Sequence, residues 1–210
     1  AMALNAFHKA LECYAVLGIN PEKQALYKKV VQVSIDGQAE TLKPVKVTVN
    51  GETKNCYLWY YHMDGGSKTE DFDHSSYAML QYYKAYESDL FENVTLDKMR
   101  TFINTVKYIM WDEVTRTVSD HVNGQETELN KTYPGWIQMS YFDPEFWEYN
   151  LKMRGDVTKE VGRMGHFLYM KSCLFGYADD LDAHPINITR YGGYDPTAIT
   201  PSTTVGKDNI

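Results

Sequence analysis

An acidic cluster with one imidazole stands immediately before an aromatic segment of helical period. Glu70, Asp71, Asp73 and His74 fall within five positions, and Tyr, Met and Leu then recur at three- and four-residue steps. Carboxylates and imidazoles bind hydroxyl groups and can exchange protons near neutral pH. The cluster therefore predicts hydroxyl recognition or acid–base chemistry at the start of this helix.

Further polar and aromatic residues gather in the other long connections between predicted helices. These connections contain YLWYYHMD at 57–64, MWDE at 110–113, DHVNG at 120–124 and YPGWIQ at 133–138. If the helices alternate in direction, connections at the same end of the bundle converge on one rim. Convergence would surround one cleft with Trp59, Tyr60, His62, Asp71, His74, Trp111, His121 and Trp136. Aromatic faces beside carboxylates and imidazoles suit a carbohydrate ligand.

The same residues also have purely structural interpretations. Asp71 and Asp73 could cap the helix, and His74 could be a hydrogen-bonded structural imidazole. Trp111 and Trp136 could belong to the core or to its rim.

A metal site is a third alternative for the cluster. Side chains with suitable oxygen and nitrogen ligands are His62, Asp64, Asp71, Asp73 and His74. Their spacing matches no familiar metal loop, so we expect no bound metal.

The elements that must position these residues follow from apolar spacing and turn signals. Two helices are predicted first, for residues 1–17, ended by Gly18, and for 20–36, with Asn20 as cap. Two more run from a cap at Asp73 or Ser75 through Tyr86 and from a cap at Thr95 to Trp111. The last three are predicted for 135–142 and 144–153, on either side of the Asp143-Pro144 step, and for 156–172. Residues 43–61 alternate around Asn50-Gly51 and predict a β-hairpin. A short hairpin or ordered loop is predicted between Trp111 and Trp136, which includes a second Asn-Gly pair.

The fold class that follows is all-α, built from antiparallel αα-hairpins with small β-hairpin inserts. Residues 1–177 form one helical domain in this prediction. Residues 178–210 are rich in Pro, Thr, Gly and Asp and predict an extended or disordered tail.

The order of these motifs resembles the later helical pairs of (α/α)-toroid proteins, the six-hairpin glycosidase-like proteins that act on polysaccharides. In that family a motif like Glu-Asp-x-x-His-Gly precedes a helix, and an Asn-containing helix ending in Trp follows. Glu70, Asp71 and His74 match the first motif, with Ser75 in place of the glycine, and Asn104 and Trp111 match the second. The resemblance covers residues 1–175 and implies a partial (α/α)-toroid.

The resemblance implies binding or processing of an oligosaccharide or polysaccharide. A lyase or epimerase would use Tyr60 or His74 to remove the proton α to a uronate carboxyl, with Asn104 neutralising that carboxyl. A hydrolase would use Asp71 with Glu70 or with a distant acid. The alternative is a non-catalytic scaffold or a saccharide-binding fragment. As part of a longer carbohydrate-active chain, it would be secreted or periplasmic.

Composition excludes other classes of function. The chain has 210 residues, a net charge of −7 and no basic run, which disfavours nucleic acid. No segment is long and apolar enough for a membrane span. The sequence contains neither a phosphate-binding loop nor a serine-nucleophile motif, so we expect no nucleotide or other cofactor.

Overall fold

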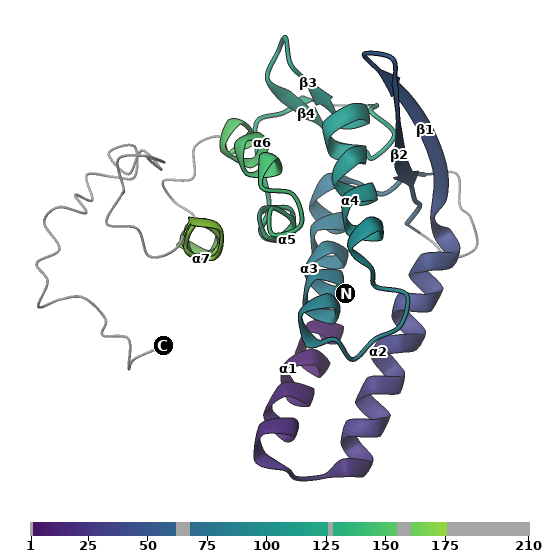
Figure 1. Cartoon of the computed structure of the whole chain (residues 1–210), viewed down its shortest axis with the longest axis vertical. Helices are drawn as coiled ribbons and strands as arrows, with labels where there is room; N and C mark the ends of the chain where they lie inside the picture. The colour runs from purple at the N-terminus through teal and green to yellow at the C-terminus, as the bar shows by residue number, and fades with distance from the viewer. Residues whose placement is uncertain (1, 62–67, 126–127, 155–160, 176–210) are drawn as a thin grey trace, which may run out of the picture. The chain divides into compact units, whose positions relative to one another are not determined.

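The computed structural model describes residues 2–61, 68–125, 128–154 and 161–175 (Figure 1). The chain divides into two compact units, Ala1–Gly155 and Asp156–Ile210. The first unit contains α1 (Met2–Leu17), α2 (Pro21–Thr41), β1 (Lys43–Val49), β2 (Glu52–Leu58), α3 (Phe72–Ser88), α4 (Leu96–Thr105), the π-helix η1 (Val106–Met110), β3 (Trp111–Asp112), β4 (Thr117–Ser119), β5 (Glu128–Leu129), α5 (Pro134–Met139) and α6 (Glu145–Met153). The described part of the second unit is α7 (Val161–Phe175). The protein is therefore mostly helical with small antiparallel β elements, as predicted.

The first two helices form an antiparallel hairpin (Figure 1). Gly18 ends α1 at φ +64°, and the Ile19 N–H donates to the Tyr14 carbonyl at 3.3 Å. That bond reaches back five residues, as in the glycine C-cap of many helices. Phe7 and Tyr27 join the pair with ring centroids 5.0 Å apart.

Helix α2 begins where predicted, with Asn20 at the N-cap position and Pro21 as its first residue, and ends later than predicted. Asn20 has φ 52° and makes no side-chain cap hydrogen bond, while its carbonyl accepts the Gln24 N–H at 3.0 Å. The helix continues through Gly37 to Thr41, past the predicted end at residue 36. A glycine inside a helix costs only about 1 kcal/mol, which does not by itself end the helix. The extension carries Gln38 and Thr41 toward the site described below.

The predicted β-hairpin is confirmed over β1 and β2. Asn50 and Gly51 form its two-residue turn, with φ of 51° and 82°. Thr105 of α4 fixes the hairpin, because its hydroxyl donates to the Tyr57 carbonyl at 2.8 Å and accepts from the Tyr57 N–H at 2.9 Å. The end of β2 is thereby held against α4.

Helix α3 begins earlier than predicted. Its N-cap is Asp71, whose Oδ1 accepts from the His74 N–H at 2.7 Å, rather than Asp73 or Ser75. Asp71 has extended backbone dihedrals because it bridges to His121, and an extended residue ahead of a helix is placed to cap it. The choice of cap thus depends on a contact 50 residues along the chain.

Helix α4 begins as predicted and ends differently. Thr95 caps it by accepting from the Lys98 N–H at 3.2 Å. The predicted single helix to Trp111 is wrong in its last turn, because the chain widens into η1 after Thr105. In η1 the buried Lys107 ammonium pairs with Asp143 and Glu145 at 3.1 and 2.6 Å.

The region between Trp111 and Trp136 contains a three-stranded sheet in the order β3-β4-β5. The turn between β3 and β4 spans residues 113–116, whereas the second Asn-Gly pair lies after β4. Helices α5 and α6 separate at Asp143-Pro144 as predicted, and the Asp143 carboxylate accepts the Glu145 N–H at 3.1 Å.

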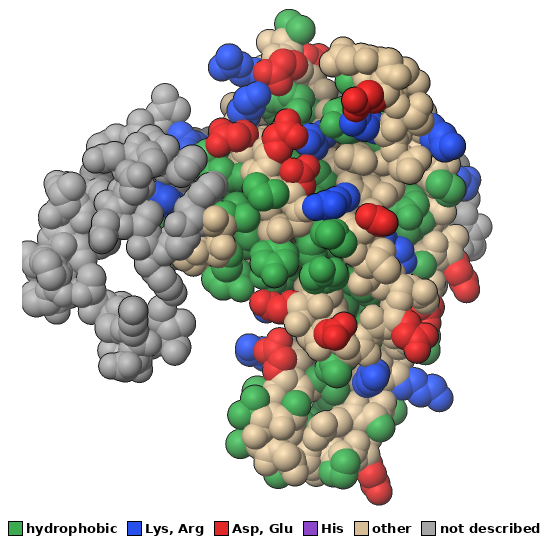
Figure 2. All heavy atoms as spheres, in the orientation of Figure 1, with side chains coloured by type: hydrophobic (Ala, Val, Ile, Leu, Met, Phe, Trp, Pro, Cys, Tyr) green, Lys and Arg blue, Asp and Glu red, His purple; other side chains and the backbone are tan. Residues whose placement is uncertain are grey.

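The core of the first unit is aromatic. Its largest fully buried side chains include Trp136, Trp147, Tyr82, Phe72, Phe102 and Phe146. On the visible face, Figure 2 shows Lys and Arg side chains interspersed among Asp and Glu. None of the described helices combines the length and the apolar character needed to cross a bilayer.

The second unit is described only over α7. Its residues 161–175 overlap the helix predicted for 156–172, and residues 156–160 lie outside the described residues. The two units divide before this helix, whereas the sequence placed the boundary after residue 177. The predicted tail at 178–210 also lies outside the described part of the chain.

Candidate functional site

Three segments from distant parts of the first unit pair at the start of α3. Tyr60, just after β2, bridges antiparallel to Thr69, and Asp71 bridges antiparallel to His121. Between them, the Glu70 N–H donates to the Trp59 carbonyl and the Glu70 carbonyl accepts the Val122 N–H, both at 3.1 Å. Two of the connections expected to converge are therefore held together by backbone hydrogen bonds.

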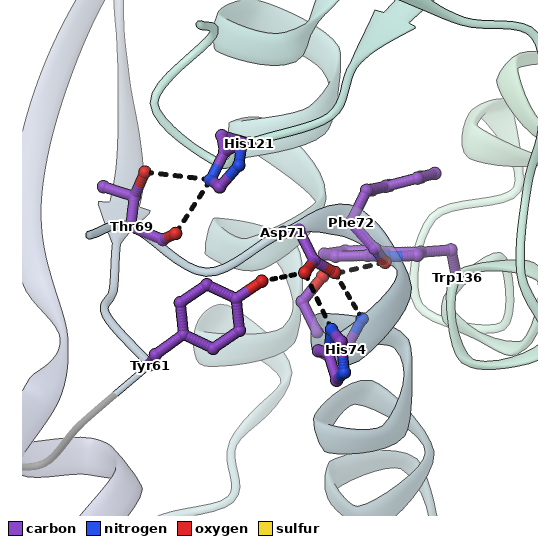
Figure 3. A network of polar contacts seen from close by, with 8 residues as sticks. Tyr61, Thr69, Asp71, Phe72, His74, His121 and Trp136 are labelled. Atoms are coloured by element: carbon purple, nitrogen blue, oxygen red, sulfur yellow. Dashed lines mark hydrogen bonds and ion pairs between the residues drawn. The ribbon is translucent and has the colours of Figure 1, made fainter. Parts of the chain in front are cut away.

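The Asp71 carboxylate is the centre of a polar network (Figure 3). Oδ1 accepts the His74 backbone N–H, and Oδ2 accepts the His74 ring Nδ1–H, each at 2.7 Å. The Tyr61 hydroxyl also donates to Oδ2. Asp71 is thus engaged by three donors, which makes it a holder of the imidazole rather than a free acid or nucleophile.

The carboxylates around His74 favour its protonated form. The pKa of His74 is raised above its ordinary value, chiefly by the hydrogen bond to Asp71, while partial burial opposes this. The negative charges of Asp71, Asp73 and Glu70 add to the increase. Nδ1 is committed to Asp71, and Nε2 makes no hydrogen bond to any described residue. Nε2 is therefore the nitrogen through which this ring can exchange a proton with a ligand.

Glu70 is a carboxyl group shifted toward its neutral form. Burial raises the pKa of Glu70, and the positive charge of His74 and the nearby Trp59 N–H only partly oppose it. A carboxyl with a raised pKa can donate a proton at a pH where an ordinary glutamate is fully ionised. Glu70 and His74 together provide two proton-exchanging groups of different type.

These residues border a cavity of about 220 Å³ in the first unit. Its walls come from the end of α2, the residues after β2, α3 and α4. The lining residues are Gln38, Thr41, Leu42, Trp59, Tyr60, Tyr61, Glu70, His74, Ala78, Met79, Tyr82 and Phe102.

Three polar atoms of the cavity walls are buried and lack a hydrogen-bond partner among the described residues. They are Tyr82 Oη, Gln38 Oε1 and Trp59 Nε1, the last of which acts on the Glu70 carboxyl without making a hydrogen bond of normal geometry to it. Trp59 and Tyr82 are only 3 % and 1 % exposed. Buried polar groups in folded proteins nearly always have a partner, so three such atoms in residues that line one cavity are donors and acceptors that a polar ligand or water could satisfy.

The structure brings five of the residues singled out in the sequence to this place. Trp59, Tyr60, Glu70 and His74 line the cavity, and Asp71 lies behind His74. His62 lies outside the described residues.

Two other predicted ligand-binding residues make structural hydrogen bonds. Asn104 donates its side-chain N–H to the Asn55 carbonyl of β2 at 2.9 Å. The buried His121 ring contacts the carbonyl oxygen of Thr69 through Nδ1 at 2.8 Å (Figure 3). Both residues fasten the segments around the cavity without lining it.

The two predicted tryptophan platforms also lie away from the cavity lining. Trp136 has no exposed surface, stacks on Phe72 with ring centroids 5.2 Å apart, and donates its indole N–H to the Phe72 carbonyl at 3.0 Å. Trp111 is half-buried and donates its indole N–H to Glu113 at 2.6 Å. The packing interpretation of Trp136 therefore matches its position.

The metal alternative finds no support in the described residues. They contain no group of three or more His, Cys, Asp or Glu side chains arranged to hold a metal ion. Of the five proposed ligands, His62 and Asp64 lie outside the part of the chain that the structure describes. The remaining three are Asp71, Asp73 and His74, and Asp71 is already bound to His74.

Sequence reasoning missed Tyr61, Tyr82 and Gln38. Tyr61 stood in the aromatic run after β2, and its neighbour Tyr60 was chosen instead. Tyr82 fits the apolar period of α3, so nothing in its spacing separates a core ring from a cavity wall. Gln38 fell beyond the predicted end of α2.

Comparison with known proteins returns no relatives. No protein-family model matches the chain, and neither a curated protein nor a solved structure matches it. The function must therefore be argued from the cavity itself.

Proposed function

We propose that this chain is a carbohydrate-active domain that binds one sugar residue of an oligosaccharide or polysaccharide in the cavity beside Glu70 and His74. The observation that carries the proposal is the set of three unpartnered polar atoms in residues of a wall that also contains aromatic rings. Sugars present apolar C–H faces and hydroxyl groups on the same ring. A wall of this composition can satisfy both.

Each unpartnered atom suits a hydroxyl group. The Trp59 indole can only donate, the Gln38 side-chain oxygen can only accept, and the Tyr82 hydroxyl can do either. A sugar hydroxyl both donates and accepts, so adjacent hydroxyls on one ring can serve all three.

The size of the cavity supports a single ring as occupant. At about 220 Å³ it is smaller than the roughly 300–1,000 Å³ of pockets that take drug-sized ligands. A longer saccharide would place one residue inside and the rest along the surface.

The enzymatic form of the proposal assigns proton transfer to Glu70 and His74. In its protonated form the Glu70 carboxyl would donate a proton to a leaving oxygen, and the neutral form of His74 would accept a proton from a ligand at Nε2, with Asp71 holding the ring. The non-catalytic form keeps the same pocket and omits the chemistry. Turnover separates the two forms.

The proposal includes a partial (α/α)-toroid as the arrangement of the helical hairpins. The antiparallel α1–α2 pair and the pairing of long connections at one side of α3 support it. A toroid would explain why the polar and aromatic connections gather at one place.

Ligand titration tests the proposal. We expect saccharides from a panel of neutral and acidic sugars to change the tryptophan fluorescence, since Trp59 lines the cavity. Tyr82→Phe, which removes only the hydroxyl group, should weaken binding about threefold to tenfold. Tyr86→Phe is the matched control, because this α3 residue packs on the Phe142 ring and does not line the cavity.

A panel in which no saccharide alters the fluorescence would contradict the proposal, as would equal affinities for Tyr82→Phe and wild type. Turnover is tested on polysaccharides by release of reducing ends and by absorbance of unsaturated uronates. In the enzymatic form, Glu70→Gln and His74→Gln lose turnover while sugar binding remains. A binding module shows retained binding without turnover in any variant.

A further inference from the structure

We infer that the cavity selects an uncharged sugar residue over the corresponding uronic acid, and that Glu70 carries this discrimination. The inference rests on the proposed function and names the class of ligand that the cavity accepts. It follows from the charges on the cavity walls and immediately behind them.

Among the residues that the structure describes, those lining the cavity include no permanent cation. None of the described lining residues is a Lys or Arg, and the lining residues with a carboxyl or imidazole group are Glu70 and His74. The unpartnered atoms of Trp59, Tyr82 and Gln38 belong to neutral side chains. The inner wall can therefore bind hydroxyl groups but cannot neutralise a carboxylate.

The positive charge that His74 can carry is already balanced. Its ring lies 2.7 Å from Asp71, and the carboxylates of Asp73 and Glu70 also act on it. The carboxylates of Asp71 and Asp73 together outweigh the single positive charge of His74, so this side of the cavity is negative when His74 is protonated and more negative when it is neutral. Ionisation of Glu70 adds a further negative charge. A second anion would be repelled in either state.

Three lysines lie against tyrosines of the cavity wall without lining the cavity. The ammonium groups of Lys43, Lys68 and Lys98 lie 4.4, 5.8 and 5.8 Å from the ring centroids of Tyr60, Tyr61 and Tyr82 respectively. Lys43 also contacts the Tyr60 hydroxyl at 3.4 Å. The lysine closest to the buried Tyr82 is Lys98, where burial lowers the pKa. These cations contribute no wall atom to pair with a bound carboxylate.

A uronate in this cavity would lose water from its carboxylate without gaining a counterion. Leaving a buried charge unpaired is costly, whereas the hydroxymethyl group of the neutral sugar can be satisfied by single hydrogen bonds. We therefore expect a neutral sugar to bind at least about tenfold more tightly than its uronic acid.

Matched sugar pairs test the inference. D-glucose with D-glucuronate, D-galactose with D-galacturonate, and D-mannose with D-mannuronate differ only in the oxidation state of C6. The whole chain is titrated at pH 7 by calorimetry and by tryptophan fluorescence. The neutral member of any pair that binds should bind at least about tenfold more tightly.

Glu70→Gln separates charge from shape. This variant keeps the size of the side chain and removes its negative charge, so the ratio of the affinity for the neutral sugar to the affinity for the uronate should fall by threefold or more. Glu87→Gln is the control, since it removes the same charge from an exposed position on α3 outside the cavity lining. Glu87→Gln should leave the ratio of the two affinities, for the neutral sugar and for the uronate, unchanged.

The outcomes are distinguishable. A uronate that binds as tightly as its neutral partner, or a ratio of the two affinities that Glu70→Gln leaves unchanged, overturns the inference while sugar binding stands. If no sugar of any pair binds, the proposed function fails and the inference fails with it.

Discussion

Asp71 caps α3 and holds the His74 imidazole with the same carboxylate. One oxygen accepts the His74 backbone N–H and the other accepts its ring Nδ1–H, each at 2.7 Å. The start of the helix and the position of the imidazole are therefore set by one side chain. Tyr61 donates to the second oxygen as well and limits its movement. A substitution of Asp71 should therefore change the pKa of His74.

Asp71→Asn should lower the pKa of His74 and leave α3 intact. Asparagine caps helices about as well as aspartate, so the cost in stability should be no more than about 1 kcal/mol. Its amide cannot provide the charged acceptor that raises the His74 pKa. The change is measured by NMR titration of the His74 ring. Asp73→Asn, which removes a carboxylate not bonded to the ring, should give a smaller decrease, and an unchanged His74 pKa in Asp71→Asn would contradict the assignment.

His8 should make the first unit less stable in acid. It lies on α1, 3 % exposed, with its ring centroid 5.0 Å from that of Phe91 in an edge-on contact. Burial lowers the pKa of His8 from 6.5 to about 4. In the unfolded chain His8 binds a proton below pH 6.5, whereas in the folded chain it does so only below about pH 4. The free energy of unfolding therefore falls as the pH falls from 6.5 to about 4. The full loss is about 3 kcal/mol.

Urea unfolding between pH 7 and pH 4 checks this, with wild type compared to His8→Gln. The difference between the free energies of unfolding of wild type and His8→Gln should shrink by up to about 3 kcal/mol toward low pH. His74→Gln gives the opposite sign, because a raised folded pKa adds stability that is present at low pH and lost as pH rises. Parallel curves for wild type and His8→Gln would rule out a buried neutral His8.

Local signals predicted much of the fold. The Thr95 cap, the Asn50-Gly51 turn and the break at Asp143-Pro144 each depend on residues within a few positions of one another. Such features can be read from one sequence because their physical causes lie in that short stretch. They fixed the order and type of most helices and of the long hairpin.

The predictions that were wrong concern features that depend on contacts between residues far apart in the sequence. Asp71, Asp73 and Ser75 all suit an N-cap, and the bridge from Asp71 to His121 decides among them. The same limit applies to the site. Trp136 has a ring typical of sugar platforms, but it is buried in the core, where its indole N–H donates to the Phe72 carbonyl. Which aromatic rings face a cavity is a property of packing that periodicity does not contain.

The link between α4 and the β1–β2 hairpin should be sensitive to one hydroxyl group. Thr105 is fully buried, and its Oγ both donates to the Tyr57 carbonyl and accepts the Tyr57 N–H. Thr105→Val keeps the shape and leaves both backbone groups without this partner, which should cost about 2 kcal/mol in urea unfolding. Thr101→Val on the same helix is the control. Its hydroxyl bonds only the Asp97 carbonyl, which the helix already uses, so the change should stay within about 0.5 kcal/mol.

Gly135 should be intolerant of any side chain, because α5 lies directly against α3 at this residue. Its N–H donates to the Ser76 hydroxyl at 2.9 Å. A Cβ atom added at Gly135 would overlap the Ser76 carbonyl oxygen and lie 2.8 Å from its carbon and 3.0 Å from the Leu80 nitrogen. All three are backbone atoms, so relief requires the two helices to separate. Gly135→Ala should therefore cost about 3 kcal/mol or more in urea unfolding.

The nature of this clash supplies its control. Truncating the neighbouring side chain in Gly135→Ala/Ser76→Ala should not restore stability, because the overlap is with backbone. Gly162→Ala places a Cβ in open space on α7 and should instead stabilise that helix by up to about 1 kcal/mol. A loss below about 1 kcal/mol for Gly135→Ala would mean that α3 and α5 are not in direct backbone contact in solution. The cavity wall on α3 would then be less firmly positioned than the proposed sugar site requires.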